Sequence, residues 1–369
     1  MDTNLEVRNG AKSRAVFTTS EMVSRLNNAR KLMTSHRLDG MILSSFESIS
    51  YFSDFTIDTT LSSPSLLLIL PDKSLLISPQ ETGGHSYRNS FCESRLYTSS
   101  EHLQYYVQHY LSSAKKIGIE SWSISDGLKN FLSAKVPALK RALCVEQALH
   151  ELKANKSDEE MSLYIRAESI AFRGLNEGIS AMCEGSSELE LALNIRNVLL
   201  KEAASFFPQL DVSRSYCLVQ SSLNTDSSIA PASTRPLVQG DLINITVCPV
   251  LGHYRYPITR SVLLGSPKQP EYAACLQRAF EKAKNRLNRE CDKDNLITQI
   301  TDELTRCIGC KENISVQISS LDACRERSTM TKQTLGQDKI VHVTIEISKQ
   351  AHDQYLNTYR LSQPILIAE

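Results

Sequence analysis

The sequence predicts two domains of different class, an α/β domain over residues 1–152 and an α+β domain over residues 153–369. In the first part, apolar strand-like segments alternate with amphipathic helical segments, as in α/β domains. The polar segment 153–158 has no apolar periodicity and is typical of a linker. Long helical segments, a β-hairpin and further strands follow it. A chain of 369 residues is long enough for each domain to bury a core of its own.

The balance of charges excludes some classes of partner. Lys plus Arg and Asp plus Glu both number 41, so we expect neither nucleic acid nor another highly charged polymer as a ligand. The first residues lack a signal-peptide core, and no apolar run reaches the length of a membrane span. These features predict a soluble, cytoplasmic protein with no membrane partner. In that compartment most of the 10 cysteines are expected to be buried thiols.

Cys307 and Cys310 form the one closely spaced cysteine pair. A CxxC pair is compatible with a redox site or with half of a zinc site. Because no second pair or histidine cluster completes a zinc site in this sequence, a structural role is the favoured interpretation.

The elements of the first domain follow from apolar spacing. Residues 18–36 carry apolar side chains at helical intervals and predict the first helix, and residues 40–45 predict a strand. The apolar segments 65–71 and 74–79, separated by a polar turn, predict a hairpin. We then expect a helix near 101–114, a buried strand at 116–121 and a shorter helix at 125–134.

The second domain begins with two helices that carry the same start signal. Residues 157–160 form a capping box, in which Ser157 caps the helix and Glu160 reaches back, and this helix is expected to end near residue 182. Residues 187–190 repeat the pattern before a second helix that runs to about residue 204. Further helices are predicted at 271–289 and 294–307, and strands at 215–220, 313–319, 340–347 and 363–368.

Residues 240–264 predict the central hairpin of this domain. Two apolar, β-branched runs, 242–250 and 258–264, flank a polar turn that contains Gly252, His253 and Tyr254. We expect four side chains to point inward, and none of them ionises near neutral pH: Asn244, Thr246, Pro257 and Thr259.

These segments resemble the creatinase/aminopeptidase P/prolidase superfamily (M24), and its creatinase branch most closely. The resemblance spans nearly the whole chain, and it implies the pita-bread fold for the second domain and a creatinase-like N-terminal domain for the first. It rests on the order and spacing of segments 5–18, 48–55, 80–88, 152–171, 223–235, 240–254, 342–347 and 359–367.

The resemblance to the metal-dependent peptidases implies positions for their metal ligands. The two hairpin aspartates fall on Thr246 and Pro257, and the two late glutamates fall on Glu346 and near Ser362. The glycine-rich histidine turn is absent, since residues 318–341 contain no histidine. A dinuclear site needs several carboxylates for ligation and charge compensation. We therefore expect no metal, no other cofactor and no metallopeptidase activity.

The resemblance to creatinase, which works without metal, implies a second set of positions. The creatinase histidine falls on Ile229 and the hairpin glutamate on Thr259, directly before the retained Arg260. The late carboxylate and histidine fall on residues 361–363. The arginine that a neighbouring subunit contributes to the active site falls near Ser62 and Ser63. Creatine hydrolysis by the family mechanism is therefore not expected. Homodimerisation is expected, because in this family each active site includes residues from the neighbouring subunit.

Two functions remain compatible with these residues. The first is a metal-independent, homodimeric protein that binds a small ligand or assembles with a partner, without creatinase or peptidase activity. The second is a rewired enzyme that cleaves C–N bonds of a small guanidino or amino-acid-like compound. It would use Glu346 as its catalytic carboxylate, with Tyr254, Tyr256, His253 or Cys248 transferring protons.

Each candidate residue also has a structural interpretation. Glu346 is either a ligand anchor or a carboxylate satisfied by Arg260 or Arg360. His253 and Tyr254 are expected to face solvent or an interface at the tip of the hairpin. His342 is expected to be a core or edge residue. The predicted ligand-binding residues are Thr246, His253, Tyr254, Tyr256, Thr259, Arg260 and Arg360.

Overall fold

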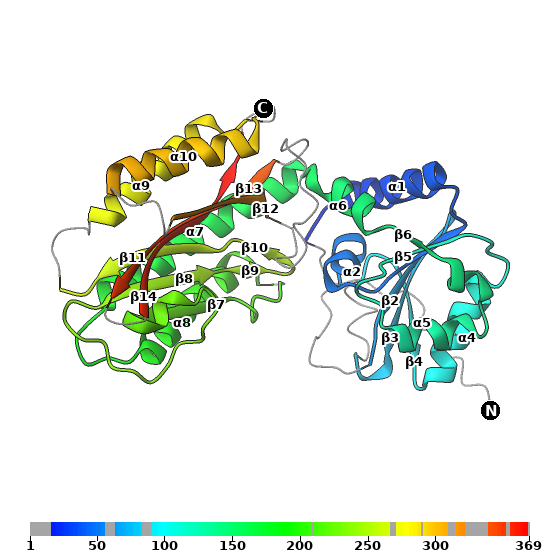
Figure 1. Cartoon of the computed structure of the whole chain (residues 1–369). Helices are drawn as coiled ribbons and strands as arrows, with labels where there is room; N and C mark the ends of the chain where they lie inside the picture. Colours follow the sequence, from blue (N-terminus) through cyan, green and yellow to red (C-terminus); the bar gives the residue numbers. More distant parts are fainter. Residues whose placement is uncertain are drawn as a thin grey trace. The chain divides into compact units, whose positions relative to one another are not determined.

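The computed structural model of the chain divides into two compact units, Met1–Lys153 (unit 1) and Ala154–Glu369 (unit 2) (Figure 1). The structure describes residues 16–55, 63–82, 90–208, 210–265, 271–288, 291–308, 314–321, 339–351 and 355–367.

Unit 1 is built on a mixed sheet of six strands in the order β4-β3-β2-β1-β5-β6. The expected hairpin is confirmed, because β2 and β3 pair antiparallel. Strand β4 pairs parallel with β3, β5 pairs parallel with β1, and β6 pairs parallel with β5. The strands are β1 (Gly40–Leu43), β2 (Leu66–Ile69), β3 (Ser74–Pro79), β4 (Glu93–Tyr97), β5 (Ile117–Ile119) and β6 (Leu143–Cys144).

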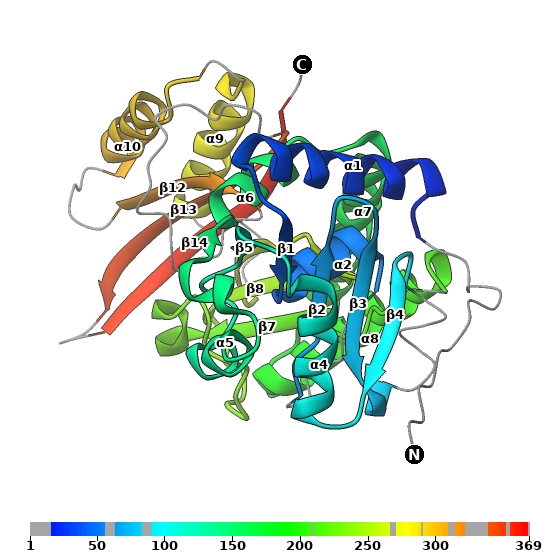
Figure 2. The ribbon, with the colours of Figure 1, turned by 90° about the vertical axis from the view of Figure 1, so that its right-hand side faces the viewer.

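Helices cover both faces of this sheet (Figure 2). Successive residues of β1 point to opposite faces, so Met41 and Leu43 pack with α1 and α2, whereas Ile42 packs with α4 and α5. This three-layer arrangement confirms the predicted α/β class. The helices are α1 (Thr19–His36), α2 (Phe46–Ser53), α4 (Ser100–Leu111), α5 (Asp126–Ser133) and α6 (Glu146–Ala154), with short 3-10 turns η1 (Gln80–Thr82) and η2 (Pro137–Arg141).

Unit 2 is built on an antiparallel sheet of six strands in the order β12-β13-β14-β11-β8-β7. The predicted central hairpin is confirmed as β8 (Leu242–Cys248) and β11 (Ile258–Leu263), and its end carries a small ribbon of β9 (Val250–Leu251) and β10 (Tyr254–Arg255). The other strands are β7 (Tyr216–Ser221), β12 (Ile314–Ser320), β13 (Ile340–Ala351) and β14 (Tyr355–Leu366).

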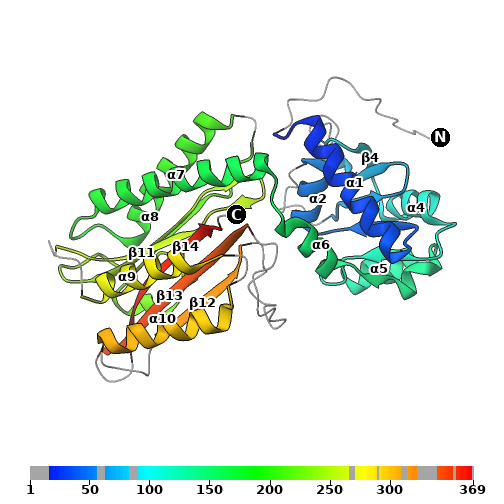
Figure 3. The same cartoon turned by 90° about the horizontal axis from the view of Figure 1, so that it is seen from above.

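Four long helices pack on unit 2's sheet. Helices α7 (Asp158–Ala181) and α8 (Glu188–Phe206) begin with the two predicted capping boxes, both confirmed, and they pack closely at Gly174 and Gly178. A Cβ atom at Gly178 would lie 2.3 Å from Ile195 Cδ1, so any larger residue would force the Ile195 side chain to move. Helices α9 (Glu271–Arg286) and α10 (Lys293–Ile308) run along β12–β14 over a shared apolar core (Figure 3).

The last strand differs from the prediction. It was expected at 363–368, but β14 begins at Tyr355 and pairs with β13 along its length. Residues 358–362 alternate polar and apolar side chains, but residues 355–357 do not extend this alternation, so it was too short to predict the full strand. No described helix is both long and apolar enough to cross a membrane.

Candidate functional site

One face of the unit 2 sheet is lined by polar side chains. Thr246 lies opposite Thr259, Thr259 opposite Ser362, and Ser362 opposite Thr344, so one row crosses four strands. Residues paired in this way, and residues two positions along a strand, point to the same face. We call this the polar face, and its members are Asn244, Thr246, Thr259, Ser261, His342, Thr344, Glu346, Arg360 and Ser362.

The hydroxyl groups of the polar face bond to one another. Thr246 Oγ1 and Thr259 Oγ1 lie 2.9 Å apart between β8 and β11, and Thr344 Oγ1 and Ser362 Oγ lie 2.9 Å apart between β13 and β14. Ser362 Oγ is also 2.7 Å from His342 Nε2. Thr246, Thr259 and Ser362 are all buried, so these contacts satisfy groups that have little access to water.

The remaining carboxylate of the polar face, Glu346, forms an ion pair with Arg360 on the neighbouring strand. The guanidinium Nε of Arg360 donates to Glu346 Oε1. Of the two partners that the sequence allowed, Arg360 is therefore the one found. The side chain of Arg360 is only 4% exposed and that of Glu346 is 23% exposed. Arg360 Nη1 has no acceptor among the described residues.

Asn244 and Ser261 connect this ion pair to the central hairpin. Ser261 Oγ donates to Asn244 Oδ1 over 2.5 Å, and the backbone N–H of Arg360 donates to Ser261 Oγ over 2.6 Å. Asn244 Nδ2 donates to the carbonyl of Thr358 over 2.8 Å. The side chains next to Arg360 are thus held by bonds to the backbone of β14.

The other face of the sheet holds two predicted site residues, Tyr256 and Arg260. Tyr256 OH donates to Glu168 Oε1 on α7 over 2.7 Å. The pKa of Tyr256 is raised, mainly by burial and to a smaller extent by this hydrogen bond to Glu168. Arg260 donates to Gln363 Oε1, and its guanidinium lies 5.9 Å from the ring centroids of Phe172 and Phe280. Burial lowers the pKa of Arg260 to about 10.

Tyr254 does not face solvent, so the prediction for the tip of the hairpin is wrong for this residue. Its side chain is 3% exposed, its hydroxyl donates to Glu160 Oε1 over 3.2 Å, and its ring meets Tyr164 edge to face. The cause is the β9–β10 ribbon, which packs against α7. His253 is half-buried, and its ring centroid lies 3.9 Å from that of Tyr254.

The structure therefore separates the predicted site residues into two groups. Thr246, Thr259, Glu346 and Arg360 share the polar face, whereas Tyr254, Tyr256 and Arg260 contact helix residues. The alternation of side chains along a strand could have predicted part of this separation, because Arg260 directly follows Thr259 and must therefore point to the opposite face of the sheet. The contact between His342 and Ser362 could not be foreseen from local sequence, because only strand pairing brings the two residues to the same face.

A buried carboxylate, Glu188 at the start of α8, anchors the loop that precedes the central hairpin. It accepts hydrogen bonds from backbone and side chain of both Ser221 and Ser233, at 2.6–2.9 Å, and from Asn224 Nδ2 at 3.1 Å. Burial opposes ionisation, but these bonds outweigh it and lower the pKa of Glu188. In the same loop Ile229, the position implied for the creatinase histidine, is 68% exposed.

The residues of the polar face do not fit the metal centre that the resemblance to peptidases implied. Divalent ions prefer ligands that compensate their charge, and here the aspartate position on β8 holds a threonine hydroxyl bonded to another threonine. The one carboxylate is paired with Arg360. No three His, Cys, Asp or Glu side chains among the described residues are placed to hold a metal ion.

Some predicted positions lie outside the described residues. Cys310 and Ser62 are among them, whereas Cys307 is described as an exposed free thiol at the end of α10. Pro257 is half-buried between β10 and β11, and Cys248 is buried at the end of β8.

Comparisons with known proteins match both units. Residues 25–147 match the Creatinase/Prolidase N-terminal domain, and residues 162–315 match Metallopeptidase family M24. Creatinase from a Bacillus species is 27% identical over 261 residues, which are 69% of this chain and 63% of that enzyme. An Xaa-Pro dipeptidase from Pyrococcus horikoshii is 28% identical over 175 residues, 47% of this chain and 48% of the dipeptidase. These matches thus span less than two thirds of either relative.

The fold is also found in solved structures. The crystal structure of the prolidase from Pyrococcus horikoshii superposes with a TM-score of 0.77 at 18% identity and covers 93% of this chain and 95% of the prolidase. At this identity the similarity shows the fold alone.

Proposed function

Because the chain belongs to the creatinase/M24 superfamily with the pita-bread fold, we propose that it keeps this fold without the family's hydrolytic chemistry. It acts as a metal-independent homodimer that binds a small ligand or assembles with a partner, and it lacks creatinase and peptidase activity.

The observation that carries this proposal is the bonding of the polar face. At the positions where the family resemblance implies acidic residues, Thr246, Thr259 and Ser362 bond to neighbouring side chains. A hydroxyl group does not ionise near neutral pH and compensates no metal charge. These groups stabilise the sheet, because each buried donor or acceptor has a partner.

The pairing of Glu346 supports the same proposal. Recognition of a guanidinium group needs a carboxylate with both oxygens available, ideally alongside a second carboxylate. Arg360 already supplies a guanidinium to Glu346 from within the chain. A creatine-like cation would have to displace Arg360, and it would leave that buried charge unpaired.

The proposal is tested with the purified full chain in two steps. Hydrolysis of Xaa-Pro dipeptides with and without added Mn²⁺ should stay at the rate of the buffer, and analytical ultracentrifugation should show a dimer. A thermal-shift screen with amino acids and guanidino acids, and crosslinking in a cell extract, should then find a ligand or partner. Peptide turnover that depends on Mn²⁺, or the absence of any dimer, ligand and partner, would contradict the proposal.

One contact favours a second candidate function, a rewired hydrolase. A serine within hydrogen-bond distance of a histidine is the arrangement that activates a nucleophile, and Ser362 Oγ lies 2.7 Å from His342 Nε2. In this candidate Ser362 replaces Glu346 as the reactive group. A fluorophosphonate probe should then label wild-type protein but not the Ser362→Ala variant, and His342→Gln should slow the labelling. Lack of labelling in the wild type would exclude this candidate.

A further inference from the structure

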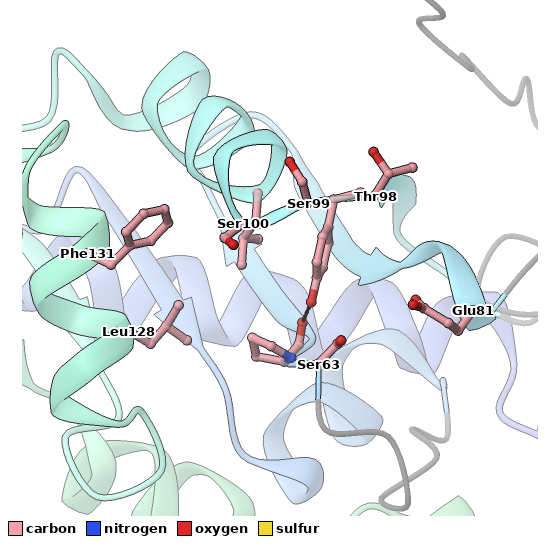
Figure 4. A pocket seen from close by; sticks show the side chains of 10 residues that line it. Ser63, Glu81, Thr98, Ser99, Ser100, Leu128 and Phe131 are labelled. Carbon is pink, nitrogen blue, oxygen red and sulfur yellow. Dashed lines mark hydrogen bonds between the residues drawn. The ribbon is translucent and has the colours of Figure 1, made fainter.

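Unit 1 contains a pocket with a cavity volume of about 330 Å³ (Figure 4). Its walls come from the end of β4, the first turn of α4, the helix α5, and the segments next to β2 and η1. This volume lies at the lower end of the range for small-molecule sites.

The buried ring of Tyr97 forms a fixed part of this pocket. Its hydroxyl donates to the carbonyl of Pro64 over 2.7 Å, which ties the end of β4 to the segment before β2. Burial raises the pKa of Tyr97 to about 12, so the phenol stays neutral at physiological pH. The pocket therefore has an aromatic wall that neither moves freely nor carries a charge.

The two ends of the pocket differ in character. Leu128 and Phe131 of α5 lie at one end, and Glu81 of η1 lies at the opposite end (Figure 4). Leu103 of α4 adds to the apolar wall. A ligand that spans the pocket therefore needs an apolar part and a polar part.

The polar groups of the pocket are available for a ligand. Among the described lining residues only Glu81 carries a charge, and no hydrogen bond from within the described chain engages its carboxylate. The hydroxyls of Thr98 and Ser100 are exposed and likewise have no described partner. Ser99 differs, because its Oγ caps α4 by accepting from the backbone N–H of His102.

We propose that this pocket binds a small organic monocation, a primary ammonium group on a short apolar or aromatic body. The ammonium group lies at Glu81, and the hydrocarbon body packs on Leu128 and Phe131. This site lies in unit 1 and does not rest on the function proposed for the sheet of unit 2.

The charges at the pocket favour a cation over an anion. The first turn of α4 offers partial positive charge, but Glu101 in that turn offsets it and Glu81 places a full negative charge at the pocket. The ring of Tyr97, which also lines the pocket, favours a cation over an anion at its face. An anionic ligand would meet repulsion from Glu81 with no cationic side chain to offset it among the described lining residues.

Three probes of similar size test the proposal: 2-phenylethylammonium, the neutral 2-phenylethanol and the anion 3-phenylpropionate. Binding to the full chain at pH 7 is followed by saturation-transfer difference NMR and titration. We expect the cation to bind most tightly, with a dissociation constant on the order of millimolar, as ligands of this size commonly do. The alcohol should bind more weakly, and the carboxylate should bind most weakly.

Two matched variants locate the site. Glu81→Gln should weaken binding of the ammonium probe roughly fivefold, the effect of one solvent-screened ion pair, and leave the alcohol unchanged. Glu93→Gln removes another exposed carboxylate of unit 1 that does not line the pocket, and it should change neither affinity. Phe131→Ala should weaken both probes, and circular dichroism checks that it folds. Equal binding of cation and anion, or a cation affinity that Glu81→Gln leaves unchanged, would overturn the proposal.

Discussion

The hydroxyl groups of Thr246 and Thr259 lie 2.9 Å apart in the middle of the unit 2 sheet, where each is the hydrogen-bond partner of the other. Both side chains are buried. The resemblance to the metal-dependent peptidases implies an aspartate at the first of these positions, 246. In this chain the position instead joins two strands, and the consequences for stability can be measured.

Replacing one member of the pair should cost more than replacing both. Thr246→Val leaves the Thr259 hydroxyl buried without its partner, which should lower the free energy of unfolding by about 1–2 kcal/mol. The double variant Thr246→Val/Thr259→Val removes both polar groups and should return to within about 1 kcal/mol of the wild type. Urea unfolding followed by far-UV circular dichroism measures this difference.

The control for that comparison is Thr298→Val on the exposed side of α10, where the hydroxyl bonds only within its own helix. It should change stability by less than about 0.5 kcal/mol. A double variant as unstable as the sum of the two single variants would show that the two hydroxyls are not coupled.

The ion pair between Glu346 and Arg360 predicts a similar asymmetry. Glu346→Gln leaves the guanidinium of Arg360 buried without its counter-charge, and we expect a loss of about 2 kcal/mol, reduced from the fully buried case because Glu346 is 23% exposed. Glu346→Leu/Arg360→Leu should lose less than the sum of its single variants. A double-mutant cycle by chemical denaturation measures the coupling.

The exposed pair of Arg173 and Glu202 serves as the comparison for that cycle. Its arginine side chain is 57% exposed, so solvent screens the interaction, and Arg173→Ala should cost less than about 1 kcal/mol. Equal coupling energies for the two pairs would contradict the structural role given to Arg360.

Glu188 predicts a pH dependence of stability. Hydrogen bonds from the Ser221 and Ser233 side chains overcome the effect of burial and place the folded-state pKa of Glu188 below its usual value of 4.5. Its contribution is therefore fully present above pH 4.5 and is lost as the pH falls through the folded-state pKa. Glu188→Gln should lower the urea midpoint at pH 7, and its difference from wild type should shrink towards pH 3. A difference that is constant between pH 7 and pH 3 would contradict this assignment.

Tyr256 is expected to matter for stability and not for ligand binding at the polar face. Tyr256→Phe removes the hydrogen bonds to Glu168 and to the carbonyl of Pro364, at a cost of about 1 kcal/mol. Tyr105→Phe, at a ring that is 53% exposed, is the matched control and should be neutral. Any ligand found by the screen should bind Tyr256→Phe with unchanged affinity, whereas a tenfold loss would place Tyr256 in the binding site.

Local sequence signals identified most of the fold. Both capping boxes and the central hairpin were predictable, because a cap or a turn depends on residues only three or four positions apart. The extent of β13 and β14 was not predictable in the same way. Their pairing joins residues such as Ser348 and Thr358, and these polar residue types do not by themselves indicate a strand.

The candidate site was predicted less completely. The sequence named Glu346 and both possible arginines, but the choice of Arg360 depends on the register of β13 against β14, which brings the two residues directly opposite. Tyr254 was misplaced because a turn tip normally faces solvent, whereas here it packs on α7 and reaches Glu160. These outcomes depend on tertiary contacts that no local pattern specifies.

Whether the chain has lost the family's hydrolytic chemistry is measured by urea release from creatine with the purified chain, and Glu346→Gln is the matched variant. Wild type and variant should both stay at the rate of buffer alone, since Glu346 is engaged by Arg360 and the implied acid positions 246, 259 and 362 carry hydroxyls. Urea release by the wild type that Glu346→Gln abolishes would contradict this loss.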